Sequence, residues 1–184
     1  MNAPGFNLQR FEPRFAANVV SWVRNARELF WLAPRTAYPL TPAKIVGWTR
    51  DCGTAFLLST DDDPEPCAYG ELNASRRNPL NMWLGHLLVD THHRQKGVGR
   101  QLTRLLVDEA FRRCGAEQLA LVVFPDNLPA IRCYMNCGFR LRGEEHQCLG
   151  TGRDRHRLLR FEMNARELAE LEDTPRRKSC SPVG

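Results

Sequence analysis

The pattern of hydrophobic and polar positions predicts a strand followed by three short helices. Residues 6–11 are partly alternating, which is typical of a strand. Apolar residues then recur at spacings of three and four, which predicts helical segments over 13–23 and 25–32. Thr41 and Pro42 can open a third helix, because threonine caps helices and proline is tolerated at their first position.

Two strands joined by a polar turn are expected next, over 54–59 and 67–73, with the turn at 61–66. Beyond them we expect strands over 82–90, 119–124, 139–149 and 155–163, and helices over 97–114, 129–136 and 165–173. The strand–helix–strand order in the middle favours parallel pairing, and the hairpins at both ends favour antiparallel pairing. The pattern therefore predicts one α/β domain with a mixed sheet.

Composition and charge then narrow the class of protein. Of 184 residues, 42% are hydrophobic and 26% are charged, which is the balance of a globular domain with a sizeable core. The apolar run at 119–124 is far too short to span a membrane, and the N-terminus lacks the features of a secretory signal. Three of the five net positive charges lie in 175–184, which reads as a disordered tail, so residues 1–174 carry only +2. Nucleic-acid and membrane binding are therefore disfavoured.

The seven cysteines are an odd number and show no paired CxxC spacing. Cys133 and Cys137 are four residues apart, which places them on one face of the predicted helix, but no further ligands complete a metal set. We therefore expect free thiols, a reducing cytoplasmic location and no metal.

The most informative segment is the loop between the strand at 82–90 and the helix that follows it. Gly97 and Gly99 let the backbone approach a ligand closely, and the first amides of a helix have no internal partners. Together with the positive end of the helix dipole, these amides predict an anion site, and Arg94, Lys96 and Arg100 add formal charge. The segment lacks the Gly-Lys-Ser/Thr of a nucleotide triphosphate loop and the third glycine of a dinucleotide loop.

Three motifs occur in the order and spacing of one family. They are Arg94-Gln-Lys-Gly97-Val-Gly99, Asn127-Leu-Pro-Ala-Ile-Arg-Cys-Tyr134, and Tyr134-Met-Asn-Cys-Gly138-Phe139. The chain resembles the GNAT superfamily of acyl-CoA-dependent N-acyltransferases, and the likeness extends over about residues 6–163. It implies a GNAT domain at 1–163, with a mostly antiparallel sheet whose two central parallel strands splay apart and are flanked by helices. Residues 164–184 would add a C-terminal helix and the basic tail.

The resemblance also implies how acetyl-CoA would bind, with no metal needed. Backbone groups of Leu87, Leu88 and Val89 would pair with the pantetheine arm. The pyrophosphate would be held by the Arg94 side chain and by the amides of Gln95, Lys96, Gly97, Val98, Gly99 and Arg100. Asn127 would contact the pantetheine region, and Tyr134 would protonate or hydrogen-bond the departing thiolate. The Val89 N–H could stabilise the oxyanion that forms when an amine attacks the thioester.

The residue that accepts the amine proton does not follow from the resemblance. The two positions that carry a glutamate base in related enzymes are Trp83 and Val122 in this chain. Glu71, at the end of the preceding strand, and His86, inside the first splayed strand, are the remaining candidates, because either can accept a proton at neutral pH. Glu71 could equally be a solvated strand end, His86 a core residue, and the proton could leave through water.

The sequence thus predicts an acetyltransferase that transfers an acetyl group from acetyl-CoA to a primary amine of a small molecule or peptide. The acceptor is expected to dock against 25–50, which carries Trp31, Tyr38 and Trp48, and against 54–73. A sensor or interaction module that binds acetyl-CoA without turnover is the alternative function. The identity of the amine and the assembly state, including a homodimer, are left open.

Overall fold

The computed structural model describes residues 5–48, 53–149 and 154–173. Its helices are η1 (Pro13–Phe15), α1 (Ala16–Ser21), α2 (Ala26–Leu32), α3 (Pro42–Trp48), η2 (Thr91–His93), α4 (Val98–Asp108), η3 (Glu109–Arg113), α5 (Leu128–Asn136) and α6 (Ala165–Asp173). Its strands are β1 (Phe6–Arg10), β2 (Gly53–Thr60), β3 (Asp63–Ala74), β4 (Asn81–Val89), β5 (Gln118–Val123), β6 (Arg140–Cys148) and β7 (Arg155–Asn164).

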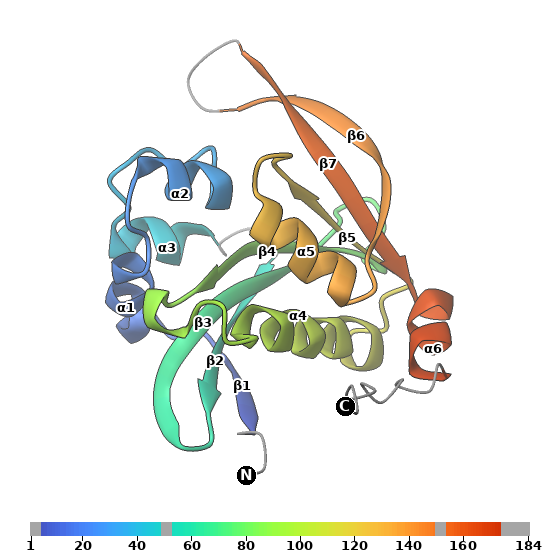
Figure 1. The fold of residues 1–184 in the computed structure, drawn as a ribbon, viewed down its shortest axis with the longest axis horizontal. Helices are drawn as coiled ribbons and strands as arrows, with labels where there is room; N and C mark the ends of the chain where they lie inside the picture. The colour runs from blue at the N-terminus through green and yellow to red at the C-terminus, as the bar shows by residue number, and fades with distance from the viewer. Residues whose placement is uncertain (1–4, 49–52, 150–153, 174–184) are drawn as a thin grey trace, which may run out of the picture.

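The strands form one sheet in the order β1-β2-β3-β4-β5-β7-β6 (Figure 1). The β4–β5 pair is parallel, and the other neighbouring pairs are antiparallel. The predicted fold class, a mixed and mostly antiparallel sheet with a central parallel pair, is therefore confirmed. The parallel pair requires a long connection, and α4 supplies it between the end of β4 and the start of β5.

Each face of the sheet has its own hydrophobic core, because side chains alternate along a strand. Phe56 and Leu58 of β2 point to the face that α4 covers, where Leu102 and Leu106 are fully buried. Leu57 and Tyr69 point to the other face, which the cluster of α1 and α3 covers. In Figure 1, α1, α2 and α3 lie grouped together, apart from α4 and α5.

Most predicted elements lie where the sequence placed them, and the differences are local. The expected turn at 61–66 is shorter, since β3 already begins at Asp63 and pairs with Thr60. The long helix ends at Asp108 and continues as the π-helical turn η3. Gly115 and Gly138 then adopt φ values of 69° and 93°, so each glycine follows a helix end in the left-handed region. The predicted disordered tail lies outside the described residues.

A bulge in β4 shapes the centre of the sheet. Tyr69 pairs with Leu88, but Glu71 pairs with Gly85, so β4 holds one more residue than β3 over this stretch. His86 lies within it at a φ of 48°, which is rare for a residue other than glycine. On its other side, β4 pairs with β5 only over Asn81–Trp83, so the two parallel strands separate beyond that point. This confirms the predicted splay.

Candidate active site

A cavity of about 1220 Å³ opens over the separated ends of β4 and β5. Its walls come from α2 and the loop after it, from the start of α4, from α5 and from the β6–β7 hairpin. Of the predicted site residues, those lining it are His86, Leu87, Leu88, Val89, Arg94, Gln95, Gly97, Gly99, Arg100, Asn127 and Tyr134. Lys96, Val98 and Glu71 do not line the cavity, and Val98 is buried in the core below it.

The amino end of α4 presents free amides to this cavity. Gly97 precedes the helix at a φ of 83°, and Gln95 has a φ of 61°, so the loop makes a sharp left-handed turn before the helix begins. The first amide bonded within the helix is that of Gln101, which donates to the Gly97 carbonyl over 3.1 Å. The amides of Val98, Gly99 and Arg100 therefore have no intrahelical partner. This arrangement fits the pyrophosphate expected there.

The three residues expected to contact pantetheine, at the end of β4, differ in the direction of their backbone groups. Asp90 donates to the Cys67 carbonyl over 2.9 Å, so its backbone belongs to the β3 ladder. Because paired groups alternate along an antiparallel strand, Leu88 also bonds toward β3, and the N–H of Val89 points to the β5 side. By the same alternation, the N–H of Leu87 also points to the β5 side. These two residues, rather than Leu88, thus offer backbone groups to a ligand between the splayed strands.

Tyr134 and Asn127 come from α5, on the far wall of the cavity. Burial raises the pKa of the Tyr134 hydroxyl, and the nearby thiols of Cys133 and Cys137 raise it further, so the phenol keeps its proton at neutral pH. Within the described part of the chain, nothing hydrogen-bonds to this hydroxyl. Asn127 caps α5, since its side-chain oxygen accepts from the Ala130 amide over 3.4 Å. Its amide nitrogen stays available to a ligand.

His86 and Glu71, the two candidate bases, are brought together by the bulge. Nδ1 of His86 lies 2.9 Å from Oε2 of Glu71, an ion-pair distance, although the two groups are not aligned as a linear hydrogen bond. The Glu71 side chain is 1% exposed, so the solvated strand end considered for it is wrong. His86 lines the cavity and Glu71 lies behind it. The arrangement lets His86 exchange a proton with a ligand while Glu71 orients the ring.

Two aromatic side chains hold this pair in place. The hydroxyl of Tyr69 donates to Oε1 of Glu71 over 2.5 Å, and burial together with the Glu71 charge raises the pKa of the Tyr69 hydroxyl. Trp48 stacks on the His86 ring with centroids 4.2 Å apart and an interplanar angle of 26°. The indole N–H of Trp48 donates to the Thr36 hydroxyl over 2.9 Å, which ties the ring to the loop after α2.

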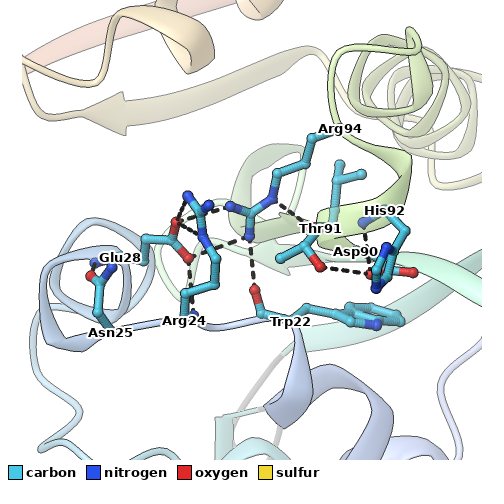
Figure 2. A network of polar contacts seen from close by, with 9 residues as sticks. Trp22, Arg24, Asn25, Glu28, Asp90, Thr91, His92 and Arg94 are labelled. Atoms are coloured by element: carbon cyan, nitrogen blue, oxygen red, sulfur yellow. Dashed lines mark hydrogen bonds and ion pairs between the residues drawn. The ribbon is translucent and has the colours of Figure 1, made fainter.

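The hydrogen bonds of the Arg94 side chain hold it away from the free amides of α4. Its Nε donates to the Val89 carbonyl over 3.1 Å, and its terminal nitrogens bond to the Trp22 carbonyl over 2.8 Å and to Glu28 over 2.9 Å (Figure 2). The guanidinium therefore joins the end of β4 to α2. The helix amides, and not the Arg94 side chain, are the groups that this conformation leaves for a pyrophosphate.

The acceptor side of the cavity differs from the expectation in two respects. Trp31 and Trp48 line it, but Tyr38 does not and is 58% exposed. No lining residue comes from 54–73 in the described ranges, because β2 and β3 lie beyond β4 in the sheet. The β6–β7 hairpin contributes instead, through Gln147, Leu149 and Leu158.

Sequence reasoning missed Glu28 and Tyr69. Tyr69 is two residues from Glu71 on one strand, and that spacing could have placed both side chains on one face. Glu28 is 66 residues from Arg94, and no local sequence pattern predicts an ion pair over that separation.

Cys133 and Cys137 lie on one face of α5, where the Cys137 thiol donates to the Arg100 carbonyl over 3.6 Å. Over residues 5–48, 53–149 and 154–173, no three His, Cys, Asp or Glu side chains group as a metal site requires. In the same ranges, no helix is long and apolar enough to cross a membrane.

The ion pairs of Glu28 predict a pH-dependent contribution to stability. Burial alone would raise the pKa of Glu28, but hydrogen bonds from Arg24 and Arg94 outweigh it and lower the pKa from 4.5 to about 2. A carboxylate whose pKa is lower in the folded state stabilises the fold above pH 4.5 and loses that effect as the pH falls toward 2. The exposed Arg24 is screened by water, so we expect a contribution of about 1–2 kcal/mol.

In Glu28→Gln, the loss of unfolding free energy between pH 5 and pH 3 should therefore be smaller than in the wild type by about 1 kcal/mol. Urea denaturation at both pH values measures this difference. Glu12→Gln is the matched control, since the Glu12–Arg14 pair has side-chain exposures of 56% and 69%. Equal pH dependence in Glu28→Gln and the wild type would contradict the assigned ion pairs.

Comparisons with known proteins show the family to which the chain belongs. Residues 23–139, more than half of the chain, match the model of the acetyltransferase (GNAT) family. A probable spermine N(1)-acetyltransferase of Bacillus subtilis subsp. natto is 30% identical over 76 residues, which cover 41% of this chain and 47% of that protein. The chain thus spans about half the length of the curated relatives that it matches.

Solved structures share the fold over nearly the whole chain. The aminoglycoside acetyltransferase AAC(6')-Ib in complex with coenzyme A superposes with a TM-score of 0.73 at 20% identity, covering 91% of this chain and 99% of that one. Spermidine N-acetyltransferase from Vibrio cholerae, in complex with CoA and spermine, gives a TM-score of 0.71 at 16% identity, covering 89% and 98%. With its three motifs, its splayed parallel strands and its match to the family model, the chain belongs to the GNAT acetyltransferase family.

Proposed function

We propose that this protein transfers an acetyl group from acetyl-CoA to a primary amine. One observation carries the proposal: a single cavity contains the free amides of α4, the unpartnered Tyr134 hydroxyl and the His86 ring. These groups match the three needs of the reaction, which are an anion site, an acid for the thiolate and a base for the amine. The neighbouring structures bound to coenzyme A support the same ligand.

The groups that line the cavity support acetyl-CoA as its ligand. Of the free amides of α4, those of Gly99 and Arg100 belong to residues that line the cavity and would bind the pyrophosphate, and the backbone of Leu87 and Val89 would pair with the pantetheine arm. This path leads along β4 toward His86, so the thioester would lie at the bulge. The Val89 N–H points between the strands but lies three residues beyond His86, so the N–H of Leu87, next to the bulge, would be the nearer donor for the oxyanion.

The two proton transfers of the reaction would take place on opposite walls of the cavity. His86, oriented by the buried Glu71, would accept the proton that the attacking amine loses. Tyr134 would donate its proton to the thiolate as the C–S bond breaks, because a protonated phenol is an acid for a leaving group that gains charge. Glu71 is a positioning residue here, since it does not line the cavity.

Two of the curated relatives are named as spermine or spermine/spermidine acetyltransferases, which supports an amine acceptor for this chain as well. The acceptor would enter between α2 and the β6–β7 hairpin, the walls that lie away from α4. We also propose the cytoplasm as the place of action, in keeping with the free thiols of Cys67, Cys114, Cys133 and Cys137.

Tyr134→Phe should separate chemistry from binding. It keeps the ring and its contact with Phe139 at 6.2 Å, so stability and acetyl-CoA affinity should remain near wild type. The turnover number should fall by about a hundredfold or more, because the thiolate loses its acid. Thiol release measures turnover, and calorimetry measures affinity. Tyr38→Phe, at the exposed tyrosine outside the cavity, should change neither. Unchanged turnover with weakened binding in Tyr134→Phe would show that Tyr134 only packs.

His86→Gly tests the base. Glycine accepts the positive φ of this position, so the fold should survive while the ring is lost. Turnover should fall by about a hundredfold. Added imidazole should restore part of it, by occupying the space beside Trp48. His92→Gly, which removes an exposed histidine outside the cavity, should keep its turnover and gain nothing from imidazole. Full turnover in His86→Gly would show that the amine proton leaves to water and not to His86.

The first experiment is an amine panel with acetyl-CoA, read by thiol release and by mass spectrometry of the products. Acetylated amine with stoichiometric thiol supports the transferase. Acetyl-CoA binding without acetylation of any amine would overturn it and favour the sensor module instead.

A further inference from the structure

Among the described residues, more positively than negatively charged side chains line the cavity. Among the described lining residues the one carboxylate is that of Glu28, whereas the lining arginines are Arg24, Arg35, Arg94, Arg100 and Arg132. The amino end of α4 adds the positive end of a helix dipole. Coenzyme A, with its phosphates, accounts for positive charge near Arg100. It does not account for positive charge on the acceptor side.

Glu28 cannot serve as an anionic subsite for an incoming cation. Its carboxylate already receives Arg94 at 2.9 Å and Arg24 at 2.5 Å, and its side chain is only 14% exposed. Glu71 is closed off behind His86 and bonded to Tyr69. Asp126, outside the lining, is held by Arg27 and by the Trp31 indole. Each nearby carboxylate is thus paired within the protein.

Arg35 differs from these carboxylates, because its charge has no partner among the described residues. It lies in the loop between α2 and α3, lines the cavity and is exposed. Nothing in the described residues bonds to or pairs with its guanidinium. Its neighbour Thr36 accepts from Trp48, and Trp48 stacks on His86, so the loop that carries Arg35 is fixed beside the base. A guanidinium held there, without a partner, is suited to bind a carboxylate or a phosphorus oxyanion.

We propose that the acceptor is a primary amine that also carries an acidic group, which Arg35 binds while His86 takes the amine proton. The inference rests on the proposed function and names its substrate class. Trp31, Leu32, Leu149 and Leu158 would contact the apolar body of such a molecule. A polycationic amine would instead bring its further charges among arginines, and no unpaired carboxylate among the described lining residues would receive them.

Matched acceptors and one charge reversal test the inference. The acceptors are α-amino acids, each paired with the amine that lacks its carboxylate, aminophosphonates as a second kind of acid, and spermidine as a polycation. Rates are compared at equal concentrations of unprotonated amine. The wild type should favour the acid-bearing member of the best pair at least tenfold in kcat/KM, and spermidine should be the poorest acceptor. Arg35→Glu should lower kcat/KM for the preferred acid at least tenfold and raise it for spermidine.

Arg10→Glu is the matched control, because it makes the same change of net charge on β1, at the edge of the sheet and outside the cavity. It should leave the order of acceptors unchanged. A wild type that prefers the amines without an acid, or spermidine, overturns the inference but leaves the transferase standing. The same holds if Arg35→Glu has no more effect than Arg10→Glu.

Calorimetry with coenzyme A present separates the two failures. If no amine of any charge is acetylated, the proposed transferase is wrong. The anion site of Arg35 then still stands if acid-bearing amines bind the wild type and not Arg35→Glu. It falls if their binding is absent or indifferent to the substitution.

Discussion

The single extra residue in β4 is the constraint on which the rest of the site depends. It turns the backbone at His86 into a conformation that costs a residue other than glycine about 1–2 kcal/mol. The stack on Trp48 and the contact with Glu71 hold the residue there. Because the bulge bends β4 away from β5, the same residue opens the cavity, frees the Val89 amide and presents the histidine ring.

A second constraint joins the two ends of the cavity. Arg94 begins the loop that leads into α4, and its guanidinium bonds to Glu28 on α2 and to the end of β4 (Figure 2). The proposed anion-binding end and the proposed acceptor wall are therefore connected through one partly buried ion pair, so a shift of α2 would change the position of the loop. The charges used in this connection are unavailable to ligands, which leaves Arg35 as the unpaired charge of the proposed acceptor wall within the described ranges.

How much the sequence predicts depends on the range of the interaction involved. Periodicity located the strands and helices, and the glycine loop with Asn127 and Tyr134 predicted residues that line one cavity, because these patterns are local. The register of β3 against β4 decides whether Glu71 meets His86, and a bulge shifts that register without leaving a pattern in the sequence. The role of Arg94 could not be predicted either, since its partner is 66 residues away and belongs to another helix.

The central claim is that coenzyme A binds to backbone groups set free by the bulge and by the start of α4. Amide hydrogen exchange, with and without coenzyme A, tests it most directly. The account predicts slower exchange, by about tenfold or more, at Val89 and Leu87 and at Gly99 and Arg100 when the ligand is bound. Amides of β1, on the far edge of the sheet, should not change. Binding of coenzyme A with unchanged exchange at both segments would contradict the claim.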